Sequence, residues 1–190
     1  RGLVINNYKT DLPVKKGLSS SAAICVLAAR AFNRIYDLKL TVRGEMELAY
    51  MGEITTPSRC GRMDQGCAFG NRPVLMIFDG DRLDTIELQV EDEMHFVVVD
   101  LGAEKDTMEI LNRLNRCYPF AENDLERGVQ ELLGPINKRV TQQAVELLTN
   151  SQGEELGKLM GEAQSFFDRY ATPVCPEELT SPVLHKVLEH

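Results

Sequence analysis

The chain has 190 residues, of which 43% are hydrophobic and 26% are charged, as in an ordinary globular protein of one large or two small domains. Its formal net charge is −8, and an acidic surface repels the phosphates of nucleic acids and the headgroups of anionic membranes. We therefore expect no nucleic-acid partner and no membrane partner, although a local ring of backbone N–H groups can still bind a small anion.

The cysteine pattern indicates reduced thiols. Five cysteines are scattered without the CxxC or CxxH spacing of a zinc site, and their odd number does not suggest a disulfide framework. No apolar run approaches the roughly 20 residues that cross a bilayer. We also expect no signal peptide before Arg1. These features predict a cytoplasmic protein, and no residue pattern predicts its oligomeric state.

The first third of the chain carries one strand pattern and several helix patterns. Leu3–Tyr8 is typical of a strand that enters a loop, and a long helix is expected to begin within Ser19–Ser21. The apolar residues that are spaced as one buried stripe of this helix are Ile24, Leu27, Ala28, Ala31, Phe32 and Ile35. A second helix is predicted at Glu45–Glu53, and a third helical stretch is predicted to begin near Met63.

Strand patterns then follow in the middle of the chain. Pro73–Asp79 is a compact apolar segment, Gly80–Asp81 is a turn signal, and Leu83–Val90 alternates apolar and polar residues. These segments predict an apolar strand, a turn and a partly exposed strand.

A charged link, Glu91–Glu93, precedes a predicted buried strand at Phe96–Val99. We place a domain boundary in this link, with one domain at 1–92 and the other at 93–190. Beyond the boundary strand the helical segments are Lys105–Asn115, Asn123–Leu133, Ile136–Leu148, Glu154–Tyr170 and a segment from Glu177 onward. Prolines and glycines separate these segments, Pro135 among them. The whole pattern predicts an α+β fold with a strand-rich first half and a mostly helical second half.

The segment Pro13–Ala23 (PVKKGLSSSAA) is suited to hold phosphates. Gly17 permits a positive φ, and the serines lie where the first N–H groups of a helix have no intrahelical partner. Those N–H groups and the positive end of the helix dipole form an anion site, and a serine hydroxyl there can ligate Mg²⁺. An ordinary serine-capped helix fits the same residues equally well. The spacing of a Walker A loop is absent from this segment.

This segment resembles the second motif of the GHMP kinases, P-x-x-x-G-L-x-S-S-A, a family that includes galactokinase, homoserine kinase and mevalonate kinase. The matching positions are Pro13, Gly17, Leu18, Ser20, Ser21 and Ala22. The resemblance implies that this loop, with Ser19, wraps the phosphates of ATP and that Ser21 contacts Mg²⁺. It also implies a two-domain fold, with a ribosomal protein S5 domain 2-like N-terminal part and a ferredoxin-like, mostly helical C-terminal part.

A second segment, Cys60–Gln65 (CGRMDQ), resembles the C-G-x-M-D-Q segment of the sugar-kinase branch of this family, notably of galactokinases. The resemblance implies that Asp64 faces the acceptor hydroxyl as a base or orienting group, and that Glu53 helps to hold Mg²⁺. Phosphoryl transfer needs both functions, because phosphate charge must be neutralised and the hydroxyl proton must be accepted. By itself, Glu53 also fits a solvated charge at a helix end, and Asp64 also fits an acid at a helix N-terminus.

Two further features bear on the sugar-kinase branch. Arg62 stands where many galactokinases have a hydrophobic residue, and it fits either a contact with an anionic group, such as that of a uronic acid, or a surface position. Leu156–Leu179 resembles the galactokinase pattern F-G-x-L-M-x-E-S-H…Y-x-V-S-C-P-E-L, with Ala163 and Gln164 in place of its Ser-His pair. This segment favours the sugar-kinase branch over the mevalonate branch.

The resemblance runs from about Leu12 to Leu179 and implies an ATP- and Mg²⁺-dependent kinase that phosphorylates a sugar or sugar acid, with C1 as the expected position. Two alternatives stay open: a kinase for another alcohol, such as mevalonate or homoserine, and a catalytically silent relative that binds sugar and nucleotide as a regulator. The family's first motif is expected before Arg1 and its glycine-rich third motif after His190. We therefore expect the chain to be a central fragment without turnover of its own.

Overall fold

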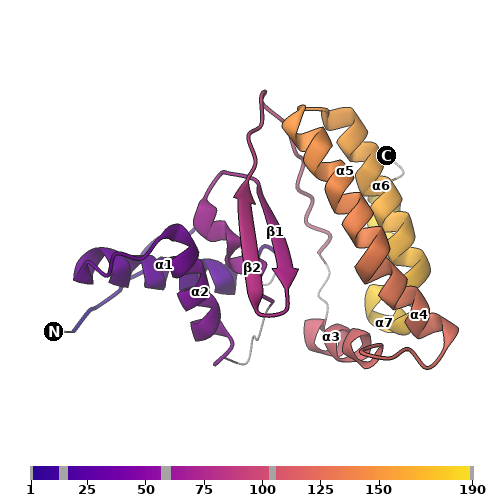
Figure 1. Ribbon diagram of the computed structural model, residues 1–190, viewed down its shortest axis with the longest axis horizontal. Coiled ribbons are helices and arrows are strands. Elements are labelled where there is room, and N and C mark those ends of the chain that lie inside the picture. Colours follow the sequence, from indigo (N-terminus) through magenta and orange to yellow (C-terminus); the bar gives the residue numbers. More distant parts are fainter. Residues whose placement is uncertain (1, 13–16, 57–60, 103–105, 189–190) are drawn as a thin grey trace. The chain divides into compact units, whose positions relative to one another are not determined.

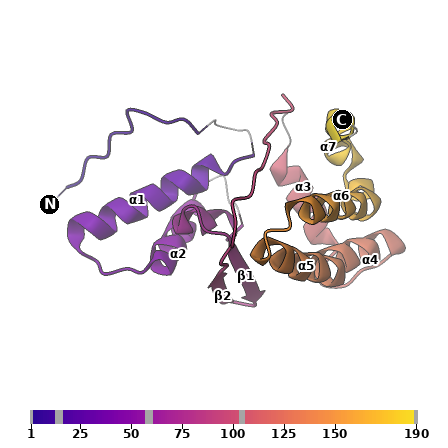
Figure 2. The same ribbon diagram turned by 90° about the horizontal axis from the view of Figure 1, so that it is seen from above.

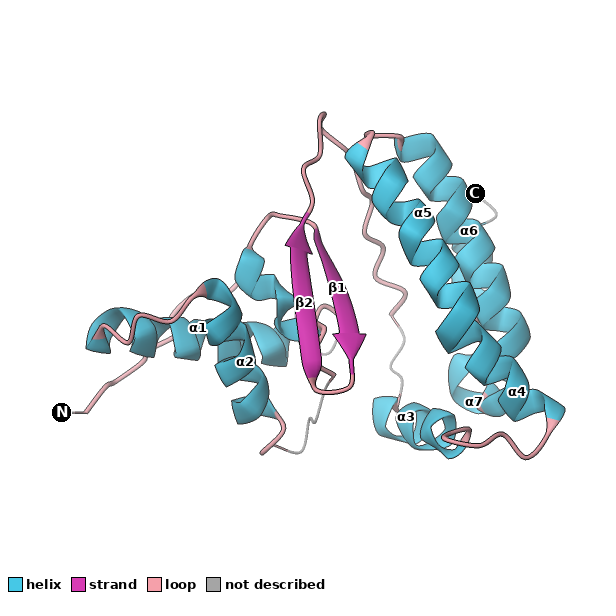
Figure 3. Ribbon diagram, in the orientation of Figure 1, coloured by secondary structure: helices cyan, strands magenta, loops and turns pink. Residues whose placement is uncertain are grey.

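The computed structural model divides the chain into two compact units, Arg1–Gln89 and Val90–His190. It describes residues 2–12, 17–56, 61–102 and 106–188. The division lies close to the boundary predicted after residue 92, and the assignment of the two units to the two domains of a kinase stays a prediction. The structure is of the α+β class, with its described strands in one hairpin and the remaining elements helical (Figures 1 and 3).

The first unit consists of two helices, a short 3₁₀ helix and a β-hairpin. In chain order these elements are α1 (Ser20–Tyr36), α2 (Val42–Glu53), η1 (Asp64–Phe69), β1 (Val74–Asp79) and β2 (Arg82–Glu87). The helix α2 begins earlier than predicted because the side chain of Thr41 accepts a hydrogen bond from the N–H of Gly44 and so caps it. The two strands pair antiparallel, with Asp79 opposite Arg82 across the predicted turn.

The core of the first unit lies between α1, α2, η1 and the hairpin. Its buried apolar residues are Ala22, Val26, Ala29, Met46, Ala49, Ala68 and Leu83. The stripe predicted to be buried on α1 is wrong, because Ile24, Leu27 and Ile35 are 57%, 62% and 58% exposed. The helix packs instead through the opposite, smaller side chains, such as Ala22 and Ala29. Small residues let the neighbouring backbone approach closely, which favours this face for helix packing.

Two of the predicted strands are wrong. Leu3–Tyr8 and Phe96–Val99 pair with no described segment, and Val4 and Val97 are 92% and 90% exposed. Both segments have the composition of a strand, but a strand is stable only when a neighbouring strand satisfies its backbone hydrogen bonds. The first half of the chain is therefore less rich in strands than predicted.

The second unit is helical in the part that the structure describes. Its elements are α3 (Thr107–Arg116), α4 (Asp124–Glu131), η2 (Leu132–Ile136), α5 (Asn137–Thr149), α6 (Gly153–Tyr170), η3 (Thr172–Val174), α7 (Pro176–Leu179) and α8 (Pro182–Leu188). The helices α5 and α6 lie side by side in both views (Figures 1 and 2). A core cluster of Leu132, Ala171, Cys175 and Leu179 packs against residues of α3, η2 and α6. The ferredoxin-like arrangement of this half stays a prediction.

The prediction that Pro135 separates two helices is wrong. It lies within η2, a π-helical turn that joins α4 directly to α5. A π turn widens the helix locally, so the helical path continues past a proline that lacks a backbone N–H. Among the described helices of both units, none combines the length and the apolar character that a membrane span requires.

Candidate functional site

The predicted phosphate loop leads into the first turn of α1. Pro13 lies outside the described residues, but Gly17 and Ser19 both have a left-handed backbone, with φ of 73° and 51°. The helix begins at Ser20, and the N–H of Ala23 donates to the carbonyl of Ser19 at 3.0 Å. A left-handed residue followed by a right-handed one turns successive N–H groups to one side. Such concave nests bind anions, and the dipole of α1 adds to the attraction.

Ser19 is not an ordinary helix cap. The caps of α2, α3 and α4 are Thr41, Asp106 and Asn123, which have extended backbones and side chains that accept a hydrogen bond from the helix. Ser19 has a left-handed backbone, and its side chain makes no capping bond. This conformation costs a non-glycine residue roughly 1–2 kcal/mol. The ordinary serine cap, which fitted the sequence equally well, is therefore not what the structure contains.

Glu53, the last residue of α2, is fully buried. The Nε2 of Gln65 donates a hydrogen bond of 2.7 Å to its Oε2, and Gln65 is fully buried as well. The interpretation of Glu53 as a solvated charge at a helix end is therefore wrong. Buried carboxylates in proteins are paired, hydrogen-bonded or bound to a metal, because an uncompensated buried charge is strongly destabilising.

Asp64 is the first residue of η1 and is half-buried. The Gln65–Glu53 hydrogen bond holds the chain directly after it against α2. On the next residue, a Cβ added to Gly66 would overlap the terminal methyl group of Met76 on β1. The turn that presents Asp64 is thus packed between α2 and the hairpin.

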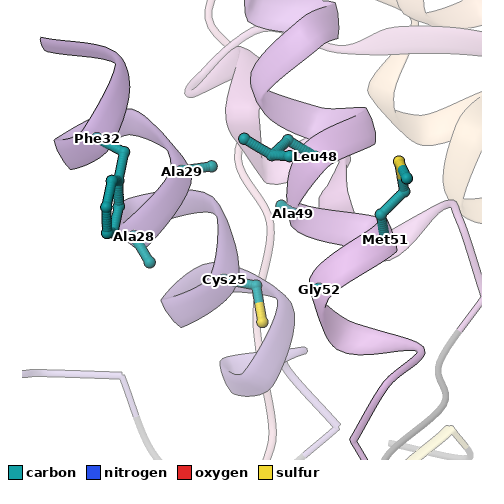
Figure 4. Close-up of a pocket in the computed structure, with 8 residues that line it drawn as sticks. All are labelled: Cys25, Ala28, Ala29, Phe32, Leu48, Ala49, Met51 and Gly52. Atoms are coloured by element: carbon teal, nitrogen blue, oxygen red, sulfur yellow. The ribbon is translucent and has the colours of Figure 1, made fainter. Parts of the chain in front are cut away.

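Cys25 links the phosphate loop to Glu53. It lies one helical turn after Ser21 on α1, and burial together with the Glu53 carboxylate raises the pKa of its thiol. Cys25 of α1 and Gly52 of α2 also line one groove between these two helices (Figure 4). The structure thus brings the end of α2 against the first turns of α1, and η1 packs on both helices. Three of the four segments that carry predicted site residues meet here, and the fourth, around Pro13, lies outside the described residues.

The donor groups at this junction fit Mg²⁺ in type. Ser21 is exposed on the first turn of α1, whereas Ala22, which was also predicted to contact the nucleotide, is fully buried. Within the described ranges, no three His, Cys, Asp or Glu side chains converge as a metal-binding group. Mg²⁺ usually binds through one or two protein oxygens and completes its shell with water and substrate phosphates. The Ser21 hydroxyl and the Glu53 carboxylate are two protein oxygens of the type that Mg²⁺ binds.

Arg62 is not a solvated surface side chain, and its charge is already paired. Its Nη2 lies 2.7 Å from both carboxylate oxygens of Glu47, and its Nη1 donates to the carbonyl of Asp81 at 3.2 Å. Its Cζ lies 5.4 Å from the ring centroid of Tyr50. Sequence analysis missed these contacts because the partners come from α2 and from the hairpin turn, and no local pattern connects them to Arg62.

The segment that resembles galactokinases in the second unit contributes to the packing of that unit. Leu156 and Leu159 are buried on α6, and Cys175 is fully buried before α7. Gln164, which replaces the family's histidine, donates a hydrogen bond of 2.8 Å to Asp168 one turn further on. The segment therefore contributes buried leucines to the core of the second unit, whereas Met160 on the same helix is 58% exposed.

An open groove of about 470 Å³ runs between α1 and α2 (Figure 4). Its lining is apolar and consists of Cys25, Ala28, Ala29, Phe32, Leu48, Ala49, Met51 and Gly52. None of the predicted site residues lines it. We therefore place the candidate site at the junction of α1, α2 and η1, and not in the groove.

Comparison with known proteins bears on this junction. Residues 2–71 match the family model described as the GHMP kinases N terminal domain. The matched stretch includes every predicted site residue, from Pro13 to Asp64. The match supports the GHMP kinase family, whose members are phosphotransferases, and it covers the first unit rather than the second. No curated protein and no solved structure matches the chain at a significant level.

Proposed function

We propose that the protein is an ATP- and Mg²⁺-dependent small-molecule kinase that phosphorylates a hydroxyl of a sugar or sugar acid at C1. One observation carries the proposal: the stretch that matches the N-terminal domain of the GHMP kinases also contains the left-handed Ser19 at the start of α1. A strained residue that caps nothing is expected where the backbone must present its N–H groups to a ligand.

The phosphate and metal contacts follow from the same segment. Backbone N–H groups from Gly17 to Ser21 and the dipole of α1 bind the phosphates of ATP. Ser21 and Glu53 would contribute oxygen ligands to Mg²⁺, which when bound would neutralise the charge that develops on the phosphates during transfer.

Asp64 acts on the acceptor. It accepts or orients the proton of the sugar hydroxyl while the hydroxyl oxygen forms a bond to the γ-phosphorus of ATP. The bond between that phosphorus and the β–γ bridging oxygen breaks, and ADP leaves with the bridging oxygen. The products are the sugar phosphate and ADP, and the proton passes from Asp64 to solvent.

Two segments favour a sugar over another alcohol as the acceptor. Cys60–Gln65 and Leu156–Leu179 both resemble galactokinases. A kinase for mevalonate or homoserine would need the same phosphate loop without these two likenesses. We further propose that the protein acts in the cytoplasm, where ATP and free monosaccharides are both present.

The test is a coupled ADP-release screen of the full-length protein against monosaccharides, uronic acids, mevalonate and homoserine. The proposal predicts turnover with a sugar or a uronic acid, and phosphorus NMR of the product should place the phosphate on C1. Turnover with mevalonate or homoserine alone would refute the sugar acceptor but keep the kinase. Tight binding of nucleotide and sugar without any turnover would instead favour the silent regulator.

A further inference from the structure

The side chain of Arg62 connects three elements of the first unit. Its guanidinium binds Glu47 and lies over the ring of Tyr50, both on α2, and it also donates to the carbonyl of Asp81 in the hairpin turn. The side chains of Arg62 and Glu47 are 22% and 30% exposed. An ion pair that is this far removed from water and has two hydrogen bonds is held more firmly than a pair on the open surface.

Asp64 lies between two residues that the same helix holds. Arg62 precedes it by two positions and binds Glu47, whereas Gln65 follows it and binds Glu53. Glu47, Tyr50 and Glu53 are spaced three residues apart on α2, so consecutive members are neighbours on its surface. The side chain of Met63, the residue immediately before Asp64, does not contribute to this anchoring, because Met63 is 67% exposed. The side-chain contacts that hold this segment against α2 are therefore those of Arg62 and Gln65, and not those of Met63.

We propose that Arg62 and Glu47 are positioning residues for Asp64, which hold the start of η1 against α2 so that the carboxylate faces the acceptor hydroxyl. This inference rests on the proposed function, because it assigns the acceptor chemistry to Asp64. A displacement of about 1 Å at a reacting group can lower a rate about 10²-fold, so an anchor two residues away is sufficient to affect catalysis. The predicted phosphate loop precedes α1, whereas the contacts of Arg62 are with α2 and the hairpin turn.

The kinetic test uses Arg62→Gln, Glu47→Gln and the double variant of the full-length protein. Each single variant should lower kcat by about 10–100-fold, with the KM for ATP nearly unchanged, because geometry is lost only at the acceptor. The double variant should be no slower than the slower single variant, since both residues act through one ion pair. Arg82→Gln is the matched control, because Arg82 forms an exposed ion pair with Asp84 in the same hairpin and should retain full activity.

A second arm separates positioning from a general structural role. In an Asp64→Asn background, Arg62→Gln should cause no further loss of kcat, because the group that it positions is already inactive. A loss by the same factor in both backgrounds would overturn the proposal, and so would wild-type kcat in Arg62→Gln. If Arg62→Gln does not fold, Arg62→Lys keeps the charge but not the paired hydrogen bonds and should show a smaller fall in kcat.

Hydrogen exchange tests the anchor independently of activity. Peptides that cover residues 61–69 should exchange faster in Arg62→Gln than in the wild type, and Arg82→Gln should leave them unchanged. If the wild-type protein phosphorylates nothing, the proposed function fails, whereas the exchange result still tests the anchor. Unchanged exchange in Arg62→Gln would overturn the anchoring role itself.

Discussion

The amide of Gln65 donates a hydrogen bond of 2.7 Å to the carboxylate of Glu53, and both side chains are fully buried. This bond joins the last residue of α2 to the 3₁₀ helix that begins with Asp64. It therefore holds the proposed metal ligand and the proposed base in one packed arrangement, although they lie 11 residues apart in the sequence.

The first prediction concerns this hydrogen bond. Gln65→Leu should lower the free energy of unfolding by about 1.5–3 kcal/mol, because it removes a donor from a buried charged acceptor. Urea unfolding of Gln65→Leu, Glu53→Gln and the double variant measures the effect. The losses of the two single variants should not add. Full additivity within about 0.5 kcal/mol would show that the two side chains do not stabilise each other directly.

A second prediction separates the left-handed Ser19 from an ordinary cap. Ser19→Gly should raise the free energy of unfolding by up to about 1 kcal/mol, because glycine adopts a positive φ without strain. Ser19→Ala should be nearly neutral, because no side-chain cap is lost. An ordinary cap gives the opposite order, since replacing a capping serine by alanine costs about 1 kcal/mol. Thermal and urea unfolding of the two variants decide between them.

The thiol of Cys25 reports on the charge of Glu53. Burial and the neighbouring carboxylate raise the pKa of Cys25, so less of its reactive thiolate is present at a given pH. Glu53→Gln should lower this pKa and speed the alkylation of Cys25 by iodoacetamide at pH 8, as followed by mass spectrometry of the Cys25 peptide. Mg²⁺ should also speed the reaction in the wild type, because a bound cation offsets the carboxylate charge.

The same experiment has an internal control. In Glu53→Gln, Mg²⁺ should leave the alkylation rate of Cys25 unchanged, because the charge that it offsets is no longer there. An equal Mg²⁺ effect in both proteins would place the metal away from Glu53.

The fourth prediction concerns the stability of the first unit in acid. Glu45 is buried, and burial opposes its charged form, but hydrogen bonds from Asn33 and Arg30 outweigh burial and lower its pKa from the ordinary value of 4.5. The charged network therefore stabilises the fold fully above pH 4.5, and its contribution is lost as the pH falls through the lowered pKa of the folded state.

Urea unfolding between pH 7 and pH 3 measures this contribution. Relative to Glu45→Gln, the wild type should be more stable at pH 7, and the difference should shrink progressively below about pH 4.5. A difference that stays constant over this range would contradict the assignment of the charged carboxylate to the Arg30–Asn33 network.

Local patterns predicted the elements whose causes are local. The start of α1 within Ser19–Ser21, the turn at Gly80–Asp81 and the long helix α6 follow from composition, turn and periodicity signals, although Ser19 does not cap α1 with its side chain. The strands at Leu3–Tyr8 and Phe96–Val99 were wrong, because pairing depends on a second strand that composition does not specify. The buried face of α1 was wrong for a related reason: two apolar stripes compete, and the partner helix selects the one with small residues.

In the candidate site, too, residue types could be predicted from the sequence, whereas long-range contacts could not. The residue types at Ser19–Ser21, Glu53 and Asp64 pointed to phosphate, metal and acceptor roles through their resemblance to one family. The sequence did not reveal that Glu53 is buried against Gln65 or that Arg62 binds Glu47, because these contacts join residues 12 and 15 positions apart through the tertiary fold. Long-range polar pairs of this kind are set by packing and carry no periodic signal.

The most direct test of the whole account is the effect of Asp64→Asn on the full-length protein. The amide keeps the shape of the carboxylate but cannot accept a proton, so kcat for the preferred sugar should fall by roughly 10²–10⁴-fold. The affinity for ATP, measured by calorimetry, should stay nearly the same, because the proposed phosphate site is at the start of α1 and does not include Asp64. A variant that binds ATP normally and turns over at the wild-type rate would contradict the role of Asp64 and the proposed mechanism with it.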